Sequence, residues 1–501
     1  MLVIIIVILV IIVILYVRER NMERTLGEIR RIQEESALHR KWLERKVRVI
    51  ERKIEMQEKE AERAKVYPLP PPEILDRPAP DAAIECARQI KERGARLQGA
   101  LDQFNIDAKV VNAIVGPQVT LFEIDPAAGV RIKDIGRVQD DIAMELRVKE
   151  HIRCLLPIPG KRLVGIEVPN DKPTTVTGYE LFTNEGWQTS AGSMQLPLAL
   201  GKNISNKSIY IDLAKAPHLL IAGATNSGKS VCLNLLIISL IFRFRPDELK
   251  MILIDPKIVE FKPYSRLPHL IIPVINEAEK APLALRWAVQ EMEARYMLLA
   301  AVNVRNIKEF NTRPPSPEPV YDENGNRIPD KLPYVVIIIN ELADIMQCAG
   351  KNVEDNLARL AANPYTIGLN VIVATQRPDV KVITGTIKSN FPIRIAFKVS
   401  SAIDSRTILD SSGAELLIGN GDMLYKGALN MERIQCGHIT DEEIERVTQY
   451  ATAQTSVQFD ERVIRALEAM EANENTPKGG HGDAMSDDDL PANDGGGQGI
   501  S

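Results

Sequence analysis

Residues 219–240 place an apolar strand before an apolar helix, with a glycine-rich turn between the two. The turn carries Gly223, Gly228, Lys229 and Ser230 in the spacing GxxxxGKS. Glycine lets the backbone curl so that successive N–H groups and the start of the helix face an anion. The lysine reaches that anion as a positive charge, and the serine hydroxyl is a ligand for Mg²⁺. The pattern predicts a phosphate-binding loop within an α/β domain.

We assign nucleotide binding to the whole loop, with ATP and Mg²⁺ as cofactors and Ser230 as the direct Mg²⁺ ligand. An ordinary glycine turn between two core elements would leave Lys229 and Ser230 in register unexplained. The nucleotide-binding residues are Gly223, Ala224, Thr225, Asn226, Ser227, Gly228, Lys229, Ser230 and Val231.

Short apolar runs alternate with helical patterns between residues 201 and 455, which is typical of a parallel sheet covered by helices. The phosphate-binding loop follows the first of these runs, at the carboxyl end of a strand, where ligands bind in such sheets. The expected strands are Leu219–Ala222, Met251–Ile254, Tyr334–Ile339, Val371–Ala374 and Ile393–Val399.

Two other strand ends carry polar residues suited to nucleotide hydrolysis. Asn340 and Glu341 follow one strand, and Gln376 follows another. The carboxylate of Glu341 can accept a proton from a water molecule that attacks the γ-phosphate, and Lys229 and Gln376 are the further catalytic candidates. Asn340 stands at the metal-side position, where its neutral oxygen allows only a weak, water-mediated contact to Mg²⁺.

Composition limits the choice of partner less than the motifs do. The chain has 501 residues, 45% of them hydrophobic, and a formal net charge of −5. This balance argues against a uniformly basic coat for nucleic acid but leaves room for a local basic channel. Its five cysteines form no CxxC pair, so neither a disulfide framework nor a structural metal site is indicated.

The N-terminus carries a candidate membrane segment. Residues 2–17 are apolar without interruption and are followed by Arg18 and Arg20. A helix of that length covers roughly 25 Å, slightly less than the ~30 Å hydrocarbon core of a bilayer. The dense charge that follows argues against a buried core helix, and the flanks differ from those of a signal peptide. We expect a single-pass transmembrane anchor in the cell membrane, with the rest of the chain in the cytoplasm.

The remaining chain divides by composition. Residues 18–66 are rich in Glu, Arg and Lys with a broken 4-3 apolar seam, so we expect a charged helical stalk or coiled coil, with a solvated single helix as the alternative. Residues 67–80 are Pro-rich and are interpreted as a linker. A smaller α/β domain is expected at 81–200 and a larger one at 201–455. Residues 456–501 should form a terminal helix and a disordered acidic, Gly-rich tail.

Long collinear blocks resemble the FtsK/SpoIIIE family of DNA-pumping motor ATPases. Two blocks upstream, GPQVTLFEIDPAAGV at 116–130 and PIPGKRLVGIEVPN at 157–170, are similar to the family's first domain, the alpha domain. The other blocks are HLLIAGATNSGKSV at 218–231, LIDPKIVEF at 253–261, INELADIM at 339–346, ATQRPDVKVITGTIKSNFPIRIAFKVSS at 374–401 and DSRTILDSSGAELLIGNGDMLY at 404–425.

The resemblance implies a RecA-like P-loop motor domain preceded by the smaller domain. It further implies a hexamer that hydrolyses ATP and translocates double-stranded DNA through its centre. Lys381 and Lys388, in the region that follows Gln376, are our candidate DNA contacts. A solvated surface position is the competing interpretation for each lysine.

Several features depart from the family pattern. Asn340 replaces the usual aspartate, and residues 363–365 (Asn-Pro-Tyr) replace a basic segment in which a trans-acting arginine is expected. Arg359 and Arg406 remain as possible substitutes. The membrane part is a single short span, and the DNA-reading winged-helix module of full-length members is not seen in the sequence.

Two alternative functions stay open at this stage. A nucleotide-binding membrane scaffold with impaired hydrolysis is suggested by Asn340 and the altered residues 363–365. A protein-secretion ATPase of related fold is the other alternative, although the alpha-like first domain favours a DNA motor. Phosphate release stimulated by DNA would separate the three functions.

Overall fold

The computed structural model describes residues 67–78 and 87–475, together with scattered helical positions between 18 and 54. Within 87–475 the gaps are 150, 216–217, 315, 317–319, 323–324, 363–366 and 428–429. The expected membrane anchor at 2–17, the altered residues 363–365 and the expected tail after 475 therefore lie outside the described residues. Across the part of the chain that is described, no helix combines the length and apolarity needed to cross a membrane.

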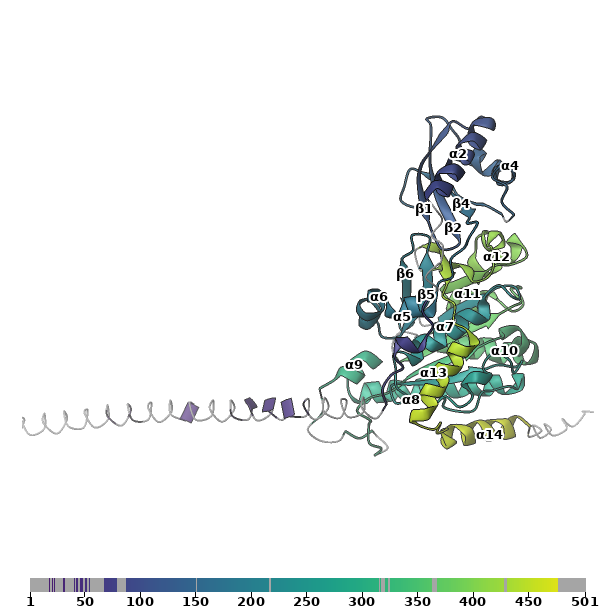
Figure 1. Cartoon of the computed structure of the whole chain (residues 1–501). Helices are drawn as coiled ribbons and strands as arrows, with labels where there is room; N and C mark the ends of the chain where they lie inside the picture. The colour runs from purple at the N-terminus through teal and green to yellow at the C-terminus, as the bar shows by residue number, and fades with distance from the viewer. Residues whose placement is uncertain are drawn as a thin grey trace, which may run out of the picture.

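The larger domain is built on a nine-stranded sheet with the order β6-β5-β13-β12-β11-β7-β10-β9-β8 (Figure 1). The neighbouring strands from β11 to β8 run parallel, and the other four extend the sheet with antiparallel strands. The expected strands and their parallel arrangement are confirmed, and the hairpins β5–β6 and β12–β13, each joined by a short loop, add antiparallel strands to the sheet. The parallel strands are β7 (His218–Ala222), β8 (Leu249–Ile254), β9 (Tyr334–Ile339), β10 (Leu369–Thr375) and β11 (Ile393–Phe397). The antiparallel strands are β5 (Pro197–Asn203), β6 (Ser208–Asp212), β12 (Asp422–Lys426) and β13 (Met431–Cys436).

Both faces of the parallel strands are buried, which explains their continuous apolar sequences. In β9, Val336 and Ile338 face one core, whereas Val335 and Ile337 face the other. The first core is covered by α5 (Gly178–Thr183), α6 (Glu185–Thr189), α7 (Lys229–Ile241), α9 (Ile307–Thr312) and α13 (Asp441–Gln454). The second is covered by α8 (Ala281–Ala301), α10 (Leu342–Ala361), α11 (Gly385–Asn390), α12 (Ala402–Leu409) and α14 (Glu461–Asn475).

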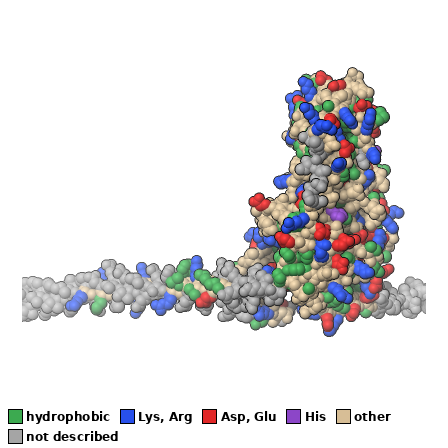
Figure 2. Space-filling model, in the orientation of Figure 1, with side chains coloured by type: hydrophobic (Ala, Val, Ile, Leu, Met, Phe, Trp, Pro, Cys, Tyr) green, Lys and Arg blue, Asp and Glu red, His purple; other side chains and the backbone are tan. Residues whose placement is uncertain are grey.

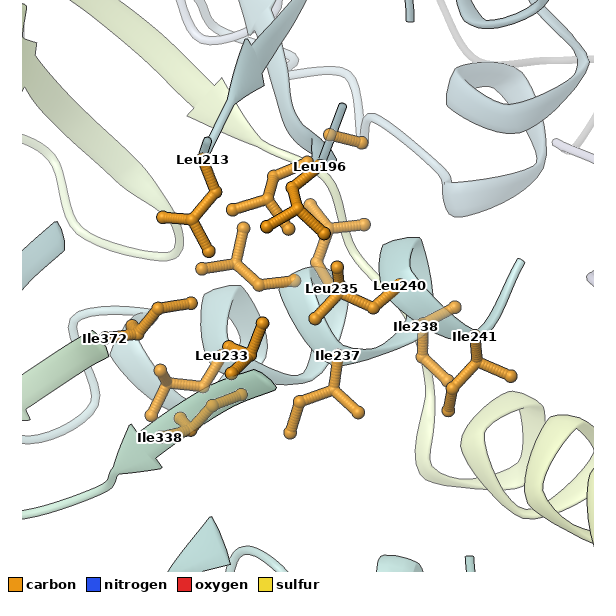
Figure 3. Packing of buried hydrophobic residues seen from close by; sticks show 14 of the residues in the cluster. Leu196, Leu213, Leu233, Leu235, Ile237, Ile238, Leu240, Ile241, Ile338 and Ile372 are labelled. Carbon is orange, nitrogen blue, oxygen red and sulfur yellow. The ribbon is translucent and has the colours of Figure 1, made fainter. Parts of the chain in front are cut away.

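Helix α7 positions the phosphate-binding loop, because the loop ends where the helix begins. The helix is apolar on nearly all sides, so it lies inside the domain instead of on its surface. Figure 3 shows Leu233 and Ile237 of α7 beside Ile338 of β9. The one buried polar side chain on this helix beyond its first turn is satisfied: the Ser239 hydroxyl donates to the carbonyl of Leu235 at 2.7 Å.

The smaller domain has a four-stranded antiparallel sheet with the order β1-β2-β4-β3 and a separate apolar core. It stacks on one end of the larger domain (Figure 1). On the face shown in Figure 2, basic and acidic side chains are interspersed, in keeping with the small net charge of −5. The strands of the smaller domain are β1 (Ala108–Val115), β2 (Val119–Pro126), β3 (Arg153–Leu155) and β4 (Val164–Pro169). Its helices are α2 (Ala87–Gln103), α3 (Ile132–Arg137) and α4 (Gln139–Glu145).

The boundary between the two domains lies near residue 170, and the boundary expected at 200 was wrong. Strand β5 pairs with β13 of the larger sheet, and Val176, Leu181 and Phe182 belong to the core around α7. The sequence of α5 and α6 is compatible with either domain, so only packing assigns these helices to the larger one.

A buried ion network joins the two domains. Arg433 on β13 donates to both carboxylate oxygens of Asp422 on β12 and to Glu167 on β4 of the smaller domain, and Arg153 also donates to Glu167. Burial alone would raise the pKa of Glu167, but Arg433 and Arg153 hold it below its usual value. Because an unpaired buried charge is costly, these residues fix how the domains sit against each other.

Residues 67–78 were expected to form a linker, and the structure shows that they pack against the larger domain. Tyr67 and Leu75 are buried, and the backbone N–H of Asp76 donates to Glu443 on α13 at 2.9 Å. Burial raises the pKa of Tyr67 to about 12, because the phenolate would lose its hydration. A short 3-10 helix, η1 (Pro72–Ile74), lies within this segment. The segment is therefore packed against the larger domain and is not a free tether.

A chain that begins at residue 67 should unfold at a higher temperature than one that begins at residue 81. The shorter chain lacks Tyr67 and Leu75, and burying a side chain of that size stabilises a fold by about 1.5–3 kcal/mol. We expect a difference of roughly 5 °C in thermal unfolding followed by circular dichroism. The longer chain with Leu75→Ala should fall between the two, and equal melting temperatures for all three chains would contradict the proposed contribution of this segment.

Candidate nucleotide-binding and hydrolysis site

The phosphate-binding loop has the shape that its glycines allow. Gly228 has φ +110° and immediately precedes α7, and a Cβ there would lie 2.5 Å from the backbone nitrogen of Gly421. A Cβ at Gly223 would lie 2.6 Å from Cβ of Phe397. The first backbone N–H groups of α7 have no partner within the helix, so they can bind an anion together with the helix dipole.

Lys229 is buried at the start of α7 and bonds to Asn340. Its Nζ donates to the Asn340 carbonyl at 3.0 Å and to the side-chain Oδ1 at 2.8 Å. Burial lowers the pKa of Lys229, while the carboxylates of Glu341 and Glu260 act in the opposite direction. The ammonium group therefore has dipolar partners in the site, which a phosphate can replace.

Asn340 is held in one orientation by Asp255, which follows β8. The Asn340 amide nitrogen donates to Asp255 Oδ1 at 3.0 Å, so its oxygen faces Lys229. The other oxygen of Asp255, Oδ2, accepts the backbone N–H groups of Val259, Glu260 and Phe261 at 2.9–3.1 Å. Asp255 is thus fully engaged by hydrogen bonds and shapes the loop that follows it.

Glu341 lies buried between three strand ends. Its carboxylate accepts a hydrogen bond from the Thr375 hydroxyl at 2.7 Å and from the backbone N–H of Gln376 at 3.1 Å. The Nζ of Lys257 lies 3.6 Å from its Oε2. The Gln376 side chain accepts a hydrogen bond from Thr225 of the phosphate-binding loop at 3.1 Å. The three catalytic candidates therefore share one site.

The side chains beside Ser230 fit a magnesium ion. The Ser230 hydroxyl donates to a carboxylate oxygen of Glu260, and Asn340 Oδ1 belongs to the same group of hydrogen-bonded residues. Hydroxyl, carboxylate and amide oxygens are the ligand types that Mg²⁺ takes in proteins, usually with nucleotide phosphates and water. Ser230 would hold the ion, which would neutralise charge on the phosphates.

Lys257 and Glu260 were not in our set of candidates, and Asp255, at the end of the neighbouring strand, was considered only as a possible source of the charge that Asn340 lacks, with a structural turn as the alternative. All lie in the block LIDPKIVEF at 253–261, which begins at a strand end. Charged residues after a parallel strand were the available signal, because such strand ends meet at one edge of the sheet. Nothing in the spacing indicated which of them would turn toward Ser230.

The two candidate DNA lysines differ in their surroundings. Lys381 is exposed in the segment between β10 and α11, beside the exposed Val380. The Nζ of Lys388 lies 2.5 Å from Oδ1 of Asp410, and Arg394 and Lys426 also form ion pairs with Asp410. Partial burial would raise the pKa of Asp410, but hydrogen bonds from these three cations hold it well below its usual value. Lys388 is therefore already paired, in a partly exposed ion cluster around Asp410.

The two candidate arginines lie on the surface of the larger domain. Arg359, on α10, pairs with Glu293 on α8 at 2.7 Å, and both side chains are more than half exposed. Arg406 is exposed on α12. Neither arginine bonds to a residue of the phosphate-binding loop in the contacts that the structure provides.

Comparisons with known proteins agree with these features. The FtsK/SpoIIIE family matches residues 179–380, and the FtsK alpha domain matches residues 69–170. A DNA translocase FtsK of Clostridium acetobutylicum is 46% identical over 383 residues, covering 76% of this chain and 48% of that protein. A DNA translocase SftA of Bacillus subtilis is 44% identical over 410 residues, covering 81% and 42%. The chain thus spans about half the length of these curated relatives or less.

A solved structure shares the fold. It is the pCW3 conjugation coupling protein TcpA in a monomer form with ATPγS, with a TM-score of 0.50 and 22% sequence identity. The match covers 73% of this chain and all of that one.

Asn340→Asp should destabilise the fold, because a carboxylate oxygen would replace the amide donor that faces Asp255 at 3.0 Å. Asp255→Asn should also destabilise it, by setting two amide donors against each other. We expect each single change to cost about 1–3 kcal/mol of unfolding free energy. The double variant restores one donor and one acceptor, so it should recover most of the loss. Denaturant unfolding of the four proteins measures the coupling, and strictly additive losses would show that the two side chains do not interact.

Proposed function

Because this chain belongs to the FtsK/SpoIIIE family, we propose that it is a motor ATPase that translocates double-stranded DNA. The observation that carries the proposal is the meeting of the phosphate-binding loop, Glu341 and Gln376 at three neighbouring strand ends. The domain that matches the FtsK alpha domain supports DNA as the substrate, since relatives that align with 76% and 81% of this chain are named DNA translocases.

Each side chain has a definite part in the proposed hydrolysis. The loop N–H groups and Lys229 bind the phosphates, and Ser230, with Asn340 as a weaker partner, would hold Mg²⁺, which would neutralise charge on the phosphates. Glu341 accepts a proton from water as the water oxygen bonds to the γ-phosphorus, and the bond to the β–γ bridging oxygen breaks to release ADP and phosphate. The side-chain amide of Gln376 accepts a hydrogen bond from Thr225 of the phosphate-binding loop, and in this position it would lie beside the γ-phosphate.

DNA translocation requires a basic surface that meets the phosphate backbone. A chain of net charge −5 can bind DNA where lysines gather in a confined channel, because neutralisation of phosphates is local. We propose that six copies form a ring around the duplex and that Lys381, exposed between β10 and α11, contacts DNA. Lys388 is the weaker candidate, since Asp410 already pairs with it.

We further propose that residues 2–17 anchor the protein in the cell membrane by a single helix, with the motor in the cytoplasm. Apolar side chains in the stalk region support self-association. Leu43, Val47, Ile50 and Ile54 follow the 4-3-4 spacing of a coiled-coil seam, and about half of each is exposed in the single chain.

The nucleotide-binding scaffold is the second candidate function, and Asn340 is the observation that favours it. Asn340 carries no charge for Mg²⁺, and its oxygen already bonds to Lys229. The buried Glu341 argues for hydrolysis, since a scaffold has no use for a carboxylate fixed by Thr375 and Gln376. A protein-secretion ATPase has no specific support in the described residues.

Phosphate release with and without duplex DNA tests the function. We expect the parent protein to hydrolyse ATP, with a rate raised several-fold by DNA. Lys229→Ala should prevent ATP binding, whereas Glu341→Gln should lower turnover by at least a hundredfold and keep ATP bound, because it removes only the proton acceptor. Glu309→Gln, on the distant α9, is the matched control. Hydrolysis that DNA does not affect would favour the secretion ATPase, and a parent that binds ATP without hydrolysing it would favour the scaffold.

DNA binding should be insensitive to sequence and should weaken steeply as salt rises, because the contacts are to phosphates. Lys381→Ala should reduce both the affinity and the slope of log affinity against log salt, by about one unit of slope per lost contact. Lys388→Ala is the comparison, since Asp410 holds that side chain. Fluorescence anisotropy with duplexes of unrelated sequence measures both quantities, and a slope unchanged by Lys381→Ala would remove this lysine from the DNA interface.

A further inference from the structure

The loop between β8 and the apolar Phe261 brings a carboxylate to Ser230. Glu260 accepts the hydrogen bond of the Ser230 hydroxyl, and the backbone N–H of Glu260 donates to Asp255 Oδ2 at 2.9 Å. The carboxylate is therefore fixed at the end of the phosphate-binding loop that holds the metal ligand.

The backbone of this loop is strained, and the strain has no gain in burial to offset it. Ile258 has φ +58°, a left-handed conformation that a β-branched residue rarely adopts and that costs about 1–3 kcal/mol. Yet Ile258 is 59% exposed, and its neighbour Val259 is 68% exposed. This conformation turns the backbone back toward the phosphate-binding loop. Three backbone hydrogen bonds to Asp255 hold the turn, and Glu260 then faces Ser230.

The other polar groups near Ser230 are committed elsewhere. Asp255 is buried, with one oxygen bound by the Asn340 amide and the other by three backbone N–H groups. Asn340 is neutral, and its oxygen accepts from Lys229. Glu260 is the carboxylate that already contacts the Ser230 hydroxyl. Neighbouring ligands of an octahedral Mg²⁺ lie about 3 Å apart, so two oxygens at hydrogen-bond distance need little movement to share one ion.

We propose that Glu260 is the acidic residue of the magnesium site, acting with Ser230 in the role that the neutral Asn340 cannot fill. The inference rests on the proposed binding of MgATP and concerns the metal side of that same site. The negative charge that position 340 lacks is thereby assigned to Glu260, in the loop after β8, and not to a residue after β9. Asp255 positions this loop through its hydrogen bonds.

Nucleotide binding at different Mg²⁺ concentrations tests the assignment without relying on turnover. The full chain in detergent micelles is titrated with a fluorescent ATP analogue, either in EDTA or across a range of Mg²⁺. Glu260→Gln should raise the Mg²⁺ concentration for half-maximal tight binding by about tenfold or more, as loss of a metal-site partner does. Its affinity in EDTA should equal that of the parent. Glu260→Asp, which keeps the charge, should recover part of the Mg²⁺ response.

Two further variants separate a metal role from a structural one. Glu445→Gln removes the same charge from α13, at the cavity that Glu260 also lines, and should leave the Mg²⁺ curve unchanged. Ser230→Ala combined with Glu260→Gln should lose less than the sum of the single losses, because both residues serve one ion. Paramagnetic resonance of Mn²⁺ with ADP should show weaker metal binding in Glu260→Gln than in the parent.

The outcomes are distinct. If Glu260→Gln weakens binding equally in EDTA and in Mg²⁺, the residue only orders the loop and the proposal is wrong. The same conclusion follows if the variant matches the parent at every Mg²⁺ concentration. A parent that binds no nucleotide at all would overturn the proposed function, and this assignment with it.

Discussion

The buried ammonium group of Lys229 is the constraint around which the site is organised. A charge at this depth is tolerated only with polar partners, and Asn340 supplies both its carbonyl and its side-chain oxygen. Asn340 can do so only because Asp255 takes its amide nitrogen. One cation at the start of α7 thus links the ends of β7, β8 and β9 through hydrogen bonds.

This arrangement explains why a neutral residue is stable at position 340. Asp255 lies against that side chain, so an acid there would create a pair of like charges in a buried site. The amide is both the acceptor for Lys229 and the donor for Asp255. The same Asp255 shapes the loop that carries Glu260. Asn340, Asp255 and Glu260 therefore belong to one hydrogen-bonded group, in which the side chain at position 340 is neutral and a carboxylate lies beside Ser230.

The contacts of the phosphate-binding loop continue to the smaller domain. The N–H of Gly421 donates to the carbonyl of Ser227, and the next residue, Asp422, binds Arg433, which also binds Glu167 in the smaller domain. The glycine at 228 belongs to the same contact, since any side chain there would strike Gly421. The loop is therefore shaped by the antiparallel half of the sheet as much as by its own sequence.

The sequence by itself determined the elements whose signals are local. The apolar runs gave the five parallel strands, the GxxxxGKS spacing gave the loop and the start of α7, and polar residues after strands gave Glu341 and Gln376. Tertiary structure alone decided the rest, because it depends on pairs far apart in the chain. Packing assigned α5 and β5 to the larger domain, placed Tyr67 in its core, and brought Asp255 to Asn340, 85 residues away, and Glu167 to Arg433, 266 residues away. A local pattern states what a segment can form, whereas the partner of a buried charge is set only when distant segments meet in the folded core.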